Sequence, residues 1–265
     1  MIGEKLRAFA YVVLLAVSAS AMAIEVDMEF SAEAVQIAPQ RQQMKTQIYV
    51  SKEAVRTESD VNNQKYIEIV FPKEGRRVML MPQQRAYMEQ RGMPPAKAPM
   101  MAGKKGVSPC EGVPNTTCRK LGTEKISGRD AEKWEISSQR DGRTIRSLHW
   151  IDVERRMPLR EMFSDGSISE LKILGKDEIN GRSTEKWQLT VTGSDGKTQQ
   201  SLQWFDPALK IAIREELPGG YVRELRNIKV AEQPQDLFTI PSGYQRMEPP
   251  PARGSRGYGG GMPQR

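Results

Sequence analysis

The sequence predicts a mainly β protein built on an antiparallel sheet. Three observations support this prediction: apolar and polar residues alternate with a period of two, Gly-containing turn pairs separate the alternating runs, and the second half of the chain repeats itself. No segment shows a long helical stripe bounded by caps, and only weak helical patterns occur near 51–58 and 233–238. We therefore expect one sheet with few short helices or loops.

An internal repeat organises the second half. Residues 121–173 align with residues 174–230, so that Trp134 answers to Trp187 and Trp150 to Trp204. Turn pairs, charged positions and all four Trp residues recur in both copies. Because two copies are too few for a solenoid, the repeat predicts two similar meanders within one sheet.

Each copy contains four alternating runs. Asp-Gly at 141–142 and at 195–196 predicts hairpins, and Gly-Arg at 128–129 and 181–182 predicts further turns. The expected strands lie near 131–139, 144–152, 156–163 and 167–174, then near 184–192, 198–205, 210–217 and 221–230. In the first half, strands are expected near 25–34, 44–50, 67–71, 77–81 and 86–89.

Residues 1–23 have the features of a secretory signal peptide. A charged start with Lys5 and Arg7 precedes an apolar run at 8–17, and a small-x-small end closes the segment at Ala23. The apolar run is shorter than the roughly 20 residues that a spanning helix needs. We expect cleavage after Ala23 and a periplasmic location, the alternative being an uncleaved anchor.

The expected export bears on the redox state of the two cysteines. Cys110 and Cys118 flank a short loop with turn residues at its centre. In an oxidising compartment such a pair most often forms a structural disulfide. Free thiols and a redox-active pair are the alternatives, although a redox pair more often has C-x-x-C spacing.

The net charge of +7 does not indicate nucleic-acid binding. The balance is only +1 over residues 24–100 and +2 over residues 101–245, with both signs interleaved, whereas the last twenty residues, 246–265, carry +3. A nucleic-acid interface requires a clustered basic face, which this distribution lacks. The tail 246–265 is rich in Pro, Gly and Arg and is expected to be disordered. It either solubilises the protein or makes transient contact with an anionic membrane.

Catalytic and metal-binding patterns are nearly absent, so we expect no enzyme, no cofactor and no metal. His149 is the only histidine, it lies mid-strand, and Gln203 occupies its place in the second repeat. A catalytic His149 is the weaker alternative. The Met residues suggest copper binding as an alternative, because thioethers suit Cu(I). The favoured interpretation is that they form an adaptable apolar lining of a cavity or binding surface. The repeated Glu-Lys-Trp at 132–134 and 185–187 is expected to form solvated strand edges around buried Trp.

Three groups of residues resemble the LolA/LolB-like superfamily of exported proteins, and the chain is most similar to an uncharacterised periplasmic branch. The groups are Phe30-Ser-Ala-Glu-Ala-Val with Ile48-Tyr-Val-Ser-Lys-Glu-Ala-Val-Arg56, the Leu-Gly-x-x-x-Ile-x-Gly-Arg-x-x-x-Lys-Trp hairpins, and Asp236-Leu-Phe-Thr-Ile-Pro-Ser-Gly-Tyr244. The resemblance implies a strongly curved antiparallel sheet, an incomplete β-barrel, with short helices or loops as a lid over its concave face. It also implies a carrier of lipids or lipoproteins, or an envelope-sensing module.

A curved sheet that fails to close leaves an apolar concavity suited to a hydrophobic ligand. We therefore expect a periplasmic carrier for a lipid or a lipoprotein acyl chain, the alternative being an envelope-sensing or protein-interaction module of the same fold. The expected ligand contacts are Met79, Met81, Met93, Met100, Met101, Trp150 and Trp204. The expected organisation is one domain over 24–245, in which N-terminal strands (24–91) and a flexible Pro/Met-rich loop (92–107) precede the two repeats.

Overall fold

The computed structural model describes residues 28–40, 42–92, 108–111, 113–140 and 142–248, and these form one large sheet. The first half contributes the strands β1 (Phe30–Ile37), β2 (Gln43–Val50), β3 (Val55–Val61), β4 (Gln64–Phe71), β5 (Arg76–Met81) and β6 (Ala86–Gln90). The 3-10 helices η3 (Pro72–Glu74) and η4 (Pro82–Gln84) connect the last of these strands.

The second half contributes nine strands, followed by a 3-10 helix and a two-residue strand. They are β7 (Thr116–Ile126), β8 (Arg129–Arg140), β9 (Arg143–Asp152), β10 (Pro158–Met162), β11 (Ile168–Ile179), β12 (Arg182–Thr192), β13 (Thr198–Asp206), β14 (Ile211–Leu217) and β15 (Tyr221–Val230), followed by η5 (Gln235–Phe238) and β16 (Gln245–Arg246). The expected strands of both repeats are confirmed, with small differences at their ends. Arg246, expected in the tail, is the last residue of β16.

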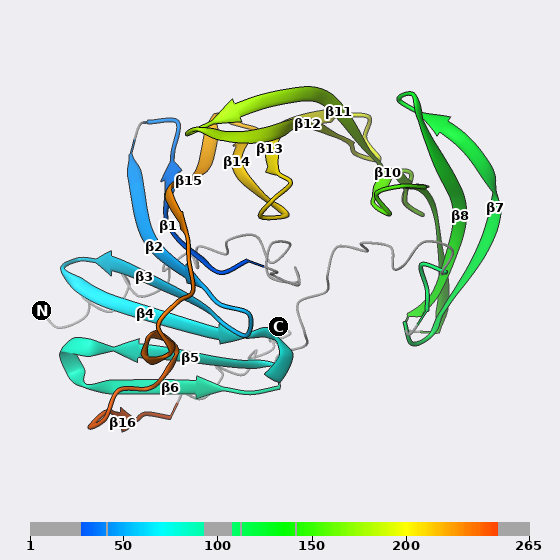
Figure 1. Cartoon of the computed structure of the whole chain (residues 1–265). Helices are drawn as coiled ribbons and strands as arrows, with labels where there is room; N and C mark the ends of the chain where they lie inside the picture. Colours follow the sequence, from blue (N-terminus) through cyan, green and yellow to red (C-terminus); the bar gives the residue numbers. More distant parts are fainter. Residues whose placement is uncertain (1–27, 41, 93–107, 112, 141, 249–265) are drawn as a thin grey trace, which may run out of the picture.

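The sheet is an open meander whose two halves are joined by one sequence-distant pairing in its middle. Its strand order is β16-β6-β5-β4-β3-β2-β1-β15-β14-β13-β12-β11-β10-β9-β8-β7. Strand β1 pairs antiparallel with both β2 and β15, which joins the two halves. Every pairing is antiparallel except that of β16 with β6. The sheet is strongly curved and its two edge strands, β7 and β16, do not meet (Figure 1).

Repeated local features position the strands. The hairpin turn of β7 and β8 has Ser127 and Gly128 at φ of 49° and 82°, and that of β11 and β12 has Asn180 and Gly181 at 52° and 74°. Two consecutive positive φ values are the mark of the type I′ hairpin, which matches the twist of the flanking strands. These are the turns that the sequence predicts around the Gly-Arg pairs.

The Leu-Gly pair that opens each repeat forms a bulge. The register of β7 with β8 shifts between Lys120 and Gly122, and that of β11 with β12 shifts between Ile173 and Gly175. Gly122 and Gly175 have φ of 153° and 148°, values that only glycine adopts readily. Because a bulge bends its strand, the pair contributes to the curvature of the sheet.

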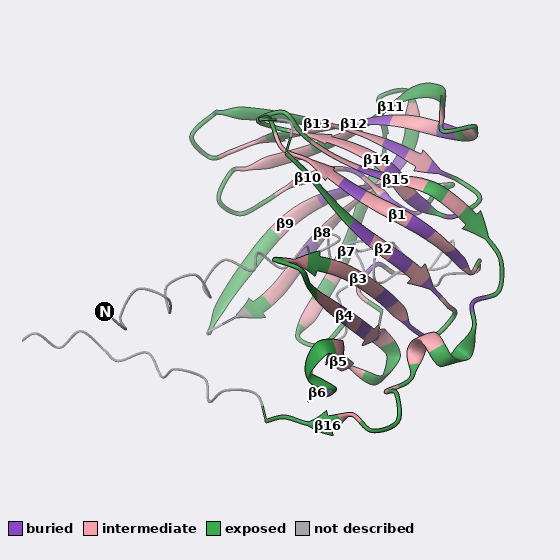
Figure 2. Cartoon of the chain, turned by 90° about the vertical axis from the view of Figure 1, so that its left-hand side faces the viewer, coloured by how far each residue is buried: buried purple, intermediate pink, exposed green. Residues whose placement is uncertain are grey.

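The core consists of three clusters spread along the sheet. One joins β1 and β2 to β14, a second lies over β4 and β5, and a third lies over β8 to β12. Many strands are buried towards one end and more exposed at the other, as at the ends of β2, β9 and β13 and at the start of β14 (Figure 2). The second cluster is covered by the chain after β15, through Phe238, Ile240 and Tyr244.

Candidate ligand-binding face

One face of the sheet from β8 to β12 carries many apolar side chains, together with Ser147, His149 and the carboxylates of Glu132, Glu161 and Glu185. Directly opposed residues of an antiparallel ladder project from the same face, and residues two positions apart share it. Trp134, His149 and Glu161 are opposed on β8, β9 and β10 and therefore lie on one face. The other residues of that face follow from the strand pairings and from steps of two residues along each strand. The apolar residues found in this way are Trp134, Ile136, Ile145, Leu171, Ile173, Trp187, Leu189 and Val191, which we call the apolar face.

The apolar face is only partly shielded from solvent. Trp187 is buried and stacks on Phe205 with ring centroids 4.5 Å apart. By contrast, Val191 is 41% exposed and Ile145 is 37% exposed. Among the described elements, η4 lies against β4 and η5 against β3, and no helix or second sheet packs over β8 to β12. The apolar face thus offers contact area to a further molecule.

The opposite face is charged and encloses two of the Trp residues. Trp150 lies between Lys133 and Arg160, whose charged groups are 4.9 and 5.3 Å from its ring centroid, and its Nε1 donates to Glu124 at 2.9 Å. Cations on both sides of an indole stabilise it through the ring quadrupole.

The second repeat reproduces this arrangement. Lys186 and Arg214 lie 4.7 and 5.4 Å from the ring centroid of Trp204, and Nε1 of Trp204 donates to Asp177 at 2.7 Å. Trp150 and Trp204 are 4% and 5% exposed. Their contact with a ligand stays a prediction, and their position on the charged face does not favour it.

The predicted methionine contacts lie partly within the described residues. Met79 of β5 is opposed by Glu68 of β4 and by Met88 of β6, and the row continues to Thr57 and Ile48. Followed through β1 and β15, the register places this row on the same side of the sheet as the apolar face. Met81 is buried. Met93, Met100 and Met101 lie outside the described residues.

The Glu-Lys-Trp segments are not solvated strand edges as expected. The Glu132 carboxylate accepts hydrogen bonds from Lys120 at 2.6 Å, Arg156 at 2.7 Å and Trp134 Nε1 at 3.3 Å, and its side chain is only 15% exposed. Burial raises the pKa of this carboxyl, but the three donors outweigh it and lower the pKa to about 2. The carboxylate is thus a half-buried partner of Lys120 on β7 and of Arg156 in the turn before β10.

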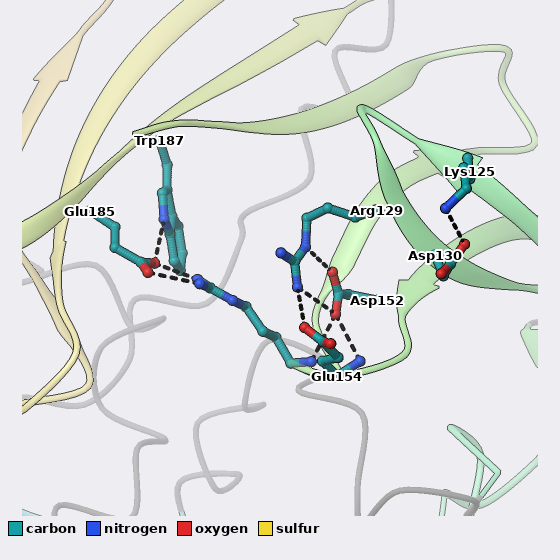
Figure 3. A network of polar contacts seen from close by, with 8 residues as sticks. Lys125, Arg129, Asp130, Asp152, Glu154, Glu185 and Trp187 are labelled. Atoms are coloured by element: carbon teal, nitrogen blue, oxygen red, sulfur yellow. Dashed lines mark hydrogen bonds and ion pairs between the residues drawn. The ribbon is translucent and has the colours of Figure 1, made fainter. Parts of the chain in front are cut away.

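The corresponding carboxylate of the second repeat links the two repeats. Glu185 accepts hydrogen bonds from Trp187 Nε1 at 3.2 Å and from Arg155 Nη2 at 2.7 Å, the latter from the turn after β9. The Arg155 hydrogen bond is the main cause of a lowered pKa at Glu185. Figure 3 shows this contact beside the pair of Arg129 and Asp152, which closes the same turn.

A hydrogen-bonded chain of Ser147, His149 and Glu161 lies on the same side as the apolar face. Ser147 Oγ is 2.8 Å from His149 Nε2, and His149 Nδ1 is 3.0 Å from Glu161 Oε1. Sequence reasoning missed this chain because Glu161 is on another strand, twelve positions from His149. Its signal was available in the repeat, where Ser147 and Glu161 recur as Ser201 and Glu215 and only the histidine differs.

The predicted disulfide is confirmed. Cys110 and Cys118 are bonded, with a Cα–Cα distance of 5.7 Å, and tie the turn at 108–111 to the start of β7. Within the described residues, no group of three or more His, Cys, Asp or Glu could hold a metal ion. The described part of the chain also has no helix long and apolar enough to cross a membrane.

Comparison with known proteins gives one family match and several similar structures. The model of a domain of unknown function, DUF4412, matches residues 33–152. No curated protein matches the chain. A LolA superfamily protein from Nitrosomonas europaea is 14% identical with a TM-score of 0.35, the match covering 83% of this chain and 94% of that one.

Two further solved structures match along most of their length. A DUF1329 family protein from Desulfovibrio piger is 14% identical, with a TM-score of 0.29 and coverage of 83% of this chain and 95% of that one. The hypothetical lipoprotein YmcC from Escherichia coli is 13% identical, with a TM-score of 0.30 and coverage of 82% and 90%. The matching structures thus include a LolA superfamily protein, from the superfamily that the sequence motifs resemble.

Proposed function

We propose that this chain is a periplasmic binding or carrier protein for an acyl chain of a lipid or lipoprotein. The observation that carries the proposal is the apolar face, whose exposed members Val191 and Ile145 stand on an unclosed sheet with a charged opposite face. Large exposed apolar patches mark binding sites on soluble proteins, and Ile145 and Val191 expose apolar side chains on two strands of this face. An acyl chain would supply the missing apolar layer.

The rest of the organisation follows from the same proposal. Cleavage after Ala23 releases a single binding domain over 24–245 into the periplasm. The row that contains Met79 and Met88 extends the ligand surface towards β5 and β6. Methionine suits such a position because its flexible thioether side chain adapts to different chain lengths and branches.

Lipid analysis of the protein purified from periplasm tests this proposal. We expect stoichiometric phospholipid or acylated peptide by mass spectrometry. Val191→Asp places a charge on the apolar face and is expected to remove the bound lipid. Thr190→Asp places the same charge one residue away on the opposite face and is expected to retain it, because adjacent strand residues point to opposite faces.

Two outcomes would count against the proposal. A wild-type protein that carries no lipid, and that instead captures a membrane protein partner, would favour the envelope-sensing alternative. Equal lipid content in the two aspartate variants would place the ligand somewhere other than the apolar face. Circular dichroism of both variants establishes that each retains the β fold.

A further inference from the structure

We propose that Ser147 is a nucleophile, activated by His149 and Glu161, that accepts an acyl group from an ester held on the apolar face. The three side chains are joined by contacts of 2.8 Å and 3.0 Å, in the order nucleophile, base and orienting carboxylate. A hydroxyl bonded to an imidazole whose other nitrogen meets a carboxylate is the geometry by which serine hydrolases are recognised on unrelated folds.

The contacts suit one tautomer of His149. A proton on Nδ1 donates to the Glu161 carboxylate, which as an ion only accepts hydrogen bonds. In the neutral ring with that tautomer, Nε2 has no proton and can accept the one from the Ser147 hydroxyl. His149 is 3% exposed, and Phe163 packs edge-on against its ring at 6.2 Å between centroids. The imidazole is therefore held in one orientation, which general-base catalysis requires.

The surroundings of Ser147 favour an acyl ester as substrate. Ser147 is partly exposed, Ile136 is directly opposite it on β8, and Ile145 precedes it by two positions on the same face. Phe163, adjacent to the imidazole, is 41% exposed. An acyl chain lying on these apolar groups would bring its ester carbonyl to the hydroxyl. This choice of substrate rests on the proposed function, whereas the reactivity of Ser147 does not.

The second repeat provides an inactive counterpart. Ser201, Gln203 and Glu215 occupy the equivalent positions, and Gln203 Nε2 donates to Glu215 Oε1 at 3.2 Å. An amide cannot accept a proton as an imidazole does, so Ser201 has no base. Glu215 also faces Arg223 at 3.7 Å, where the first repeat has Ser169. The two copies thus differ in the group that activates the serine.

The reaction balances with water as co-reactant. Ser147 Oγ attacks the ester carbonyl carbon while His149 Nε2 takes the hydroxyl proton. The ester C–O bond then breaks, and the leaving alcohol receives that proton from the imidazolium. Water, deprotonated by the same nitrogen, attacks the acyl-serine, releases the carboxylic acid and restores the hydroxyl. No oxidant or reductant takes part.

Labelling of the full exported protein with a fluorophosphonate tests the proposal, with the modified residue identified by peptide mass spectrometry. We expect label on Ser147 and none on Ser201. His149→Gln reproduces the second repeat and should slow labelling by about 100-fold or more, the usual contribution of a positioned base. Ser147→Ala should abolish labelling, and Ser201→Ala should leave it unchanged. Circular dichroism of Ser147→Ala checks that this variant folds, because the substitution leaves Nε2 of the buried His149 without its hydroxyl partner.

Hydrolysis of nitrophenyl acetate and nitrophenyl decanoate separates this proposal from the proposed function. Ser147-dependent cleavage of the acetate supports the nucleophile even if the protein binds no long acyl chain. A preference for the decanoate that Val191→Asp removes supports both. An unlabelled wild type, equal labelling of Ser147 and Ser201, or wild-type labelling of His149→Gln would overturn the assignment of Ser147.

Discussion

Single residues explain where the two repeats agree and where they diverge. The tryptophans, the turn aspartates and the cations around the indoles have the same partners in both copies. His149 and Gln203 stand at one equivalent position with different hydrogen-bonding chemistry. Repetition of sequence therefore preserves the packing of the scaffold, while one substitution gives a base to the first copy alone.

Glu132 should make the protein sensitive to acid. Its pKa of about 2 lies below the value near 4.5 of an unfolded chain, so its contribution is full above pH 4.5 and is lost as the pH falls towards 2. We expect Glu132→Gln to lower the free energy of unfolding at pH 7 by about 1–3 kcal/mol, because hydrogen bonds to a charged group are lost. Urea unfolding between pH 2 and 7 measures the difference.

The gap between Glu132→Gln and the wild type should close as the pH falls through this window. Glu178→Gln is the matched control, because Glu178 is an exposed strand residue, and we expect a change within about 0.5 kcal/mol. A constant gap from pH 7 to pH 2 would show that shape or packing, and not ionisation, accounts for the effect.

Strands were predictable where alternation and turn pairs coincide, as over 131–174 and 184–230. Strand β7 (Thr116–Ile126) was not among the expected strands. Strand β3 was not predictable, because Val55–Val61 has apolar residues only at its ends, and the residues near 51–58 resemble a weak helix. Its pairing with β2 and β4 determines its structure, with Glu58 bound to Arg56 and to Lys65 of the next strand. The sequence did not reveal the apolar face or the hydrogen bonds among Ser147, His149 and Glu161 for the same reason, since each depends on the register between strands.

The disulfide between Cys110 and Cys118 fastens a turn to the single strand β7. Cys110→Ser should leave the sheet intact, since β7 keeps its long pairing with β8. We expect a loss of about 2–3 kcal/mol in the free energy of unfolding, the loop-closure value for so short a loop. Thiol titration of the untreated exported protein should find no free thiol, and titratable cysteines would contradict both the bond and the exported location.

At the scale of the molecule, the chain after β15 returns to the first half of the sheet. Phe238, Ile240 and Tyr244 pack on the cluster of β4 and β5, and Arg56 Nη1 donates to the Leu237 carbonyl at 2.6 Å. The two faces of the sheet are therefore used differently. Residues of this same chain cover the apolar side of β4 and β5, whereas the apolar face of β8 to β12 has no such cover among the described residues.

The chain after β15 that contains Phe238, Ile240 and Tyr244, which we call the closing segment, should hold β4 to β6 in place without stabilising the second repeat. Phe238→Ala removes a partly buried ring, and we expect a loss of about 1.5–3 kcal/mol, below the full range for a buried aromatic residue. Hydrogen exchange should show faster exchange across 64–90 and unchanged exchange across 182–217, because distant strands share no contact with the ring. Tyr221→Ala, at an exposed hairpin position, is the control and should change neither. Uniformly faster exchange in Phe238→Ala would mean that the sheet opens as one cooperative unit, and that the closing segment stabilises the ligand-binding half as well.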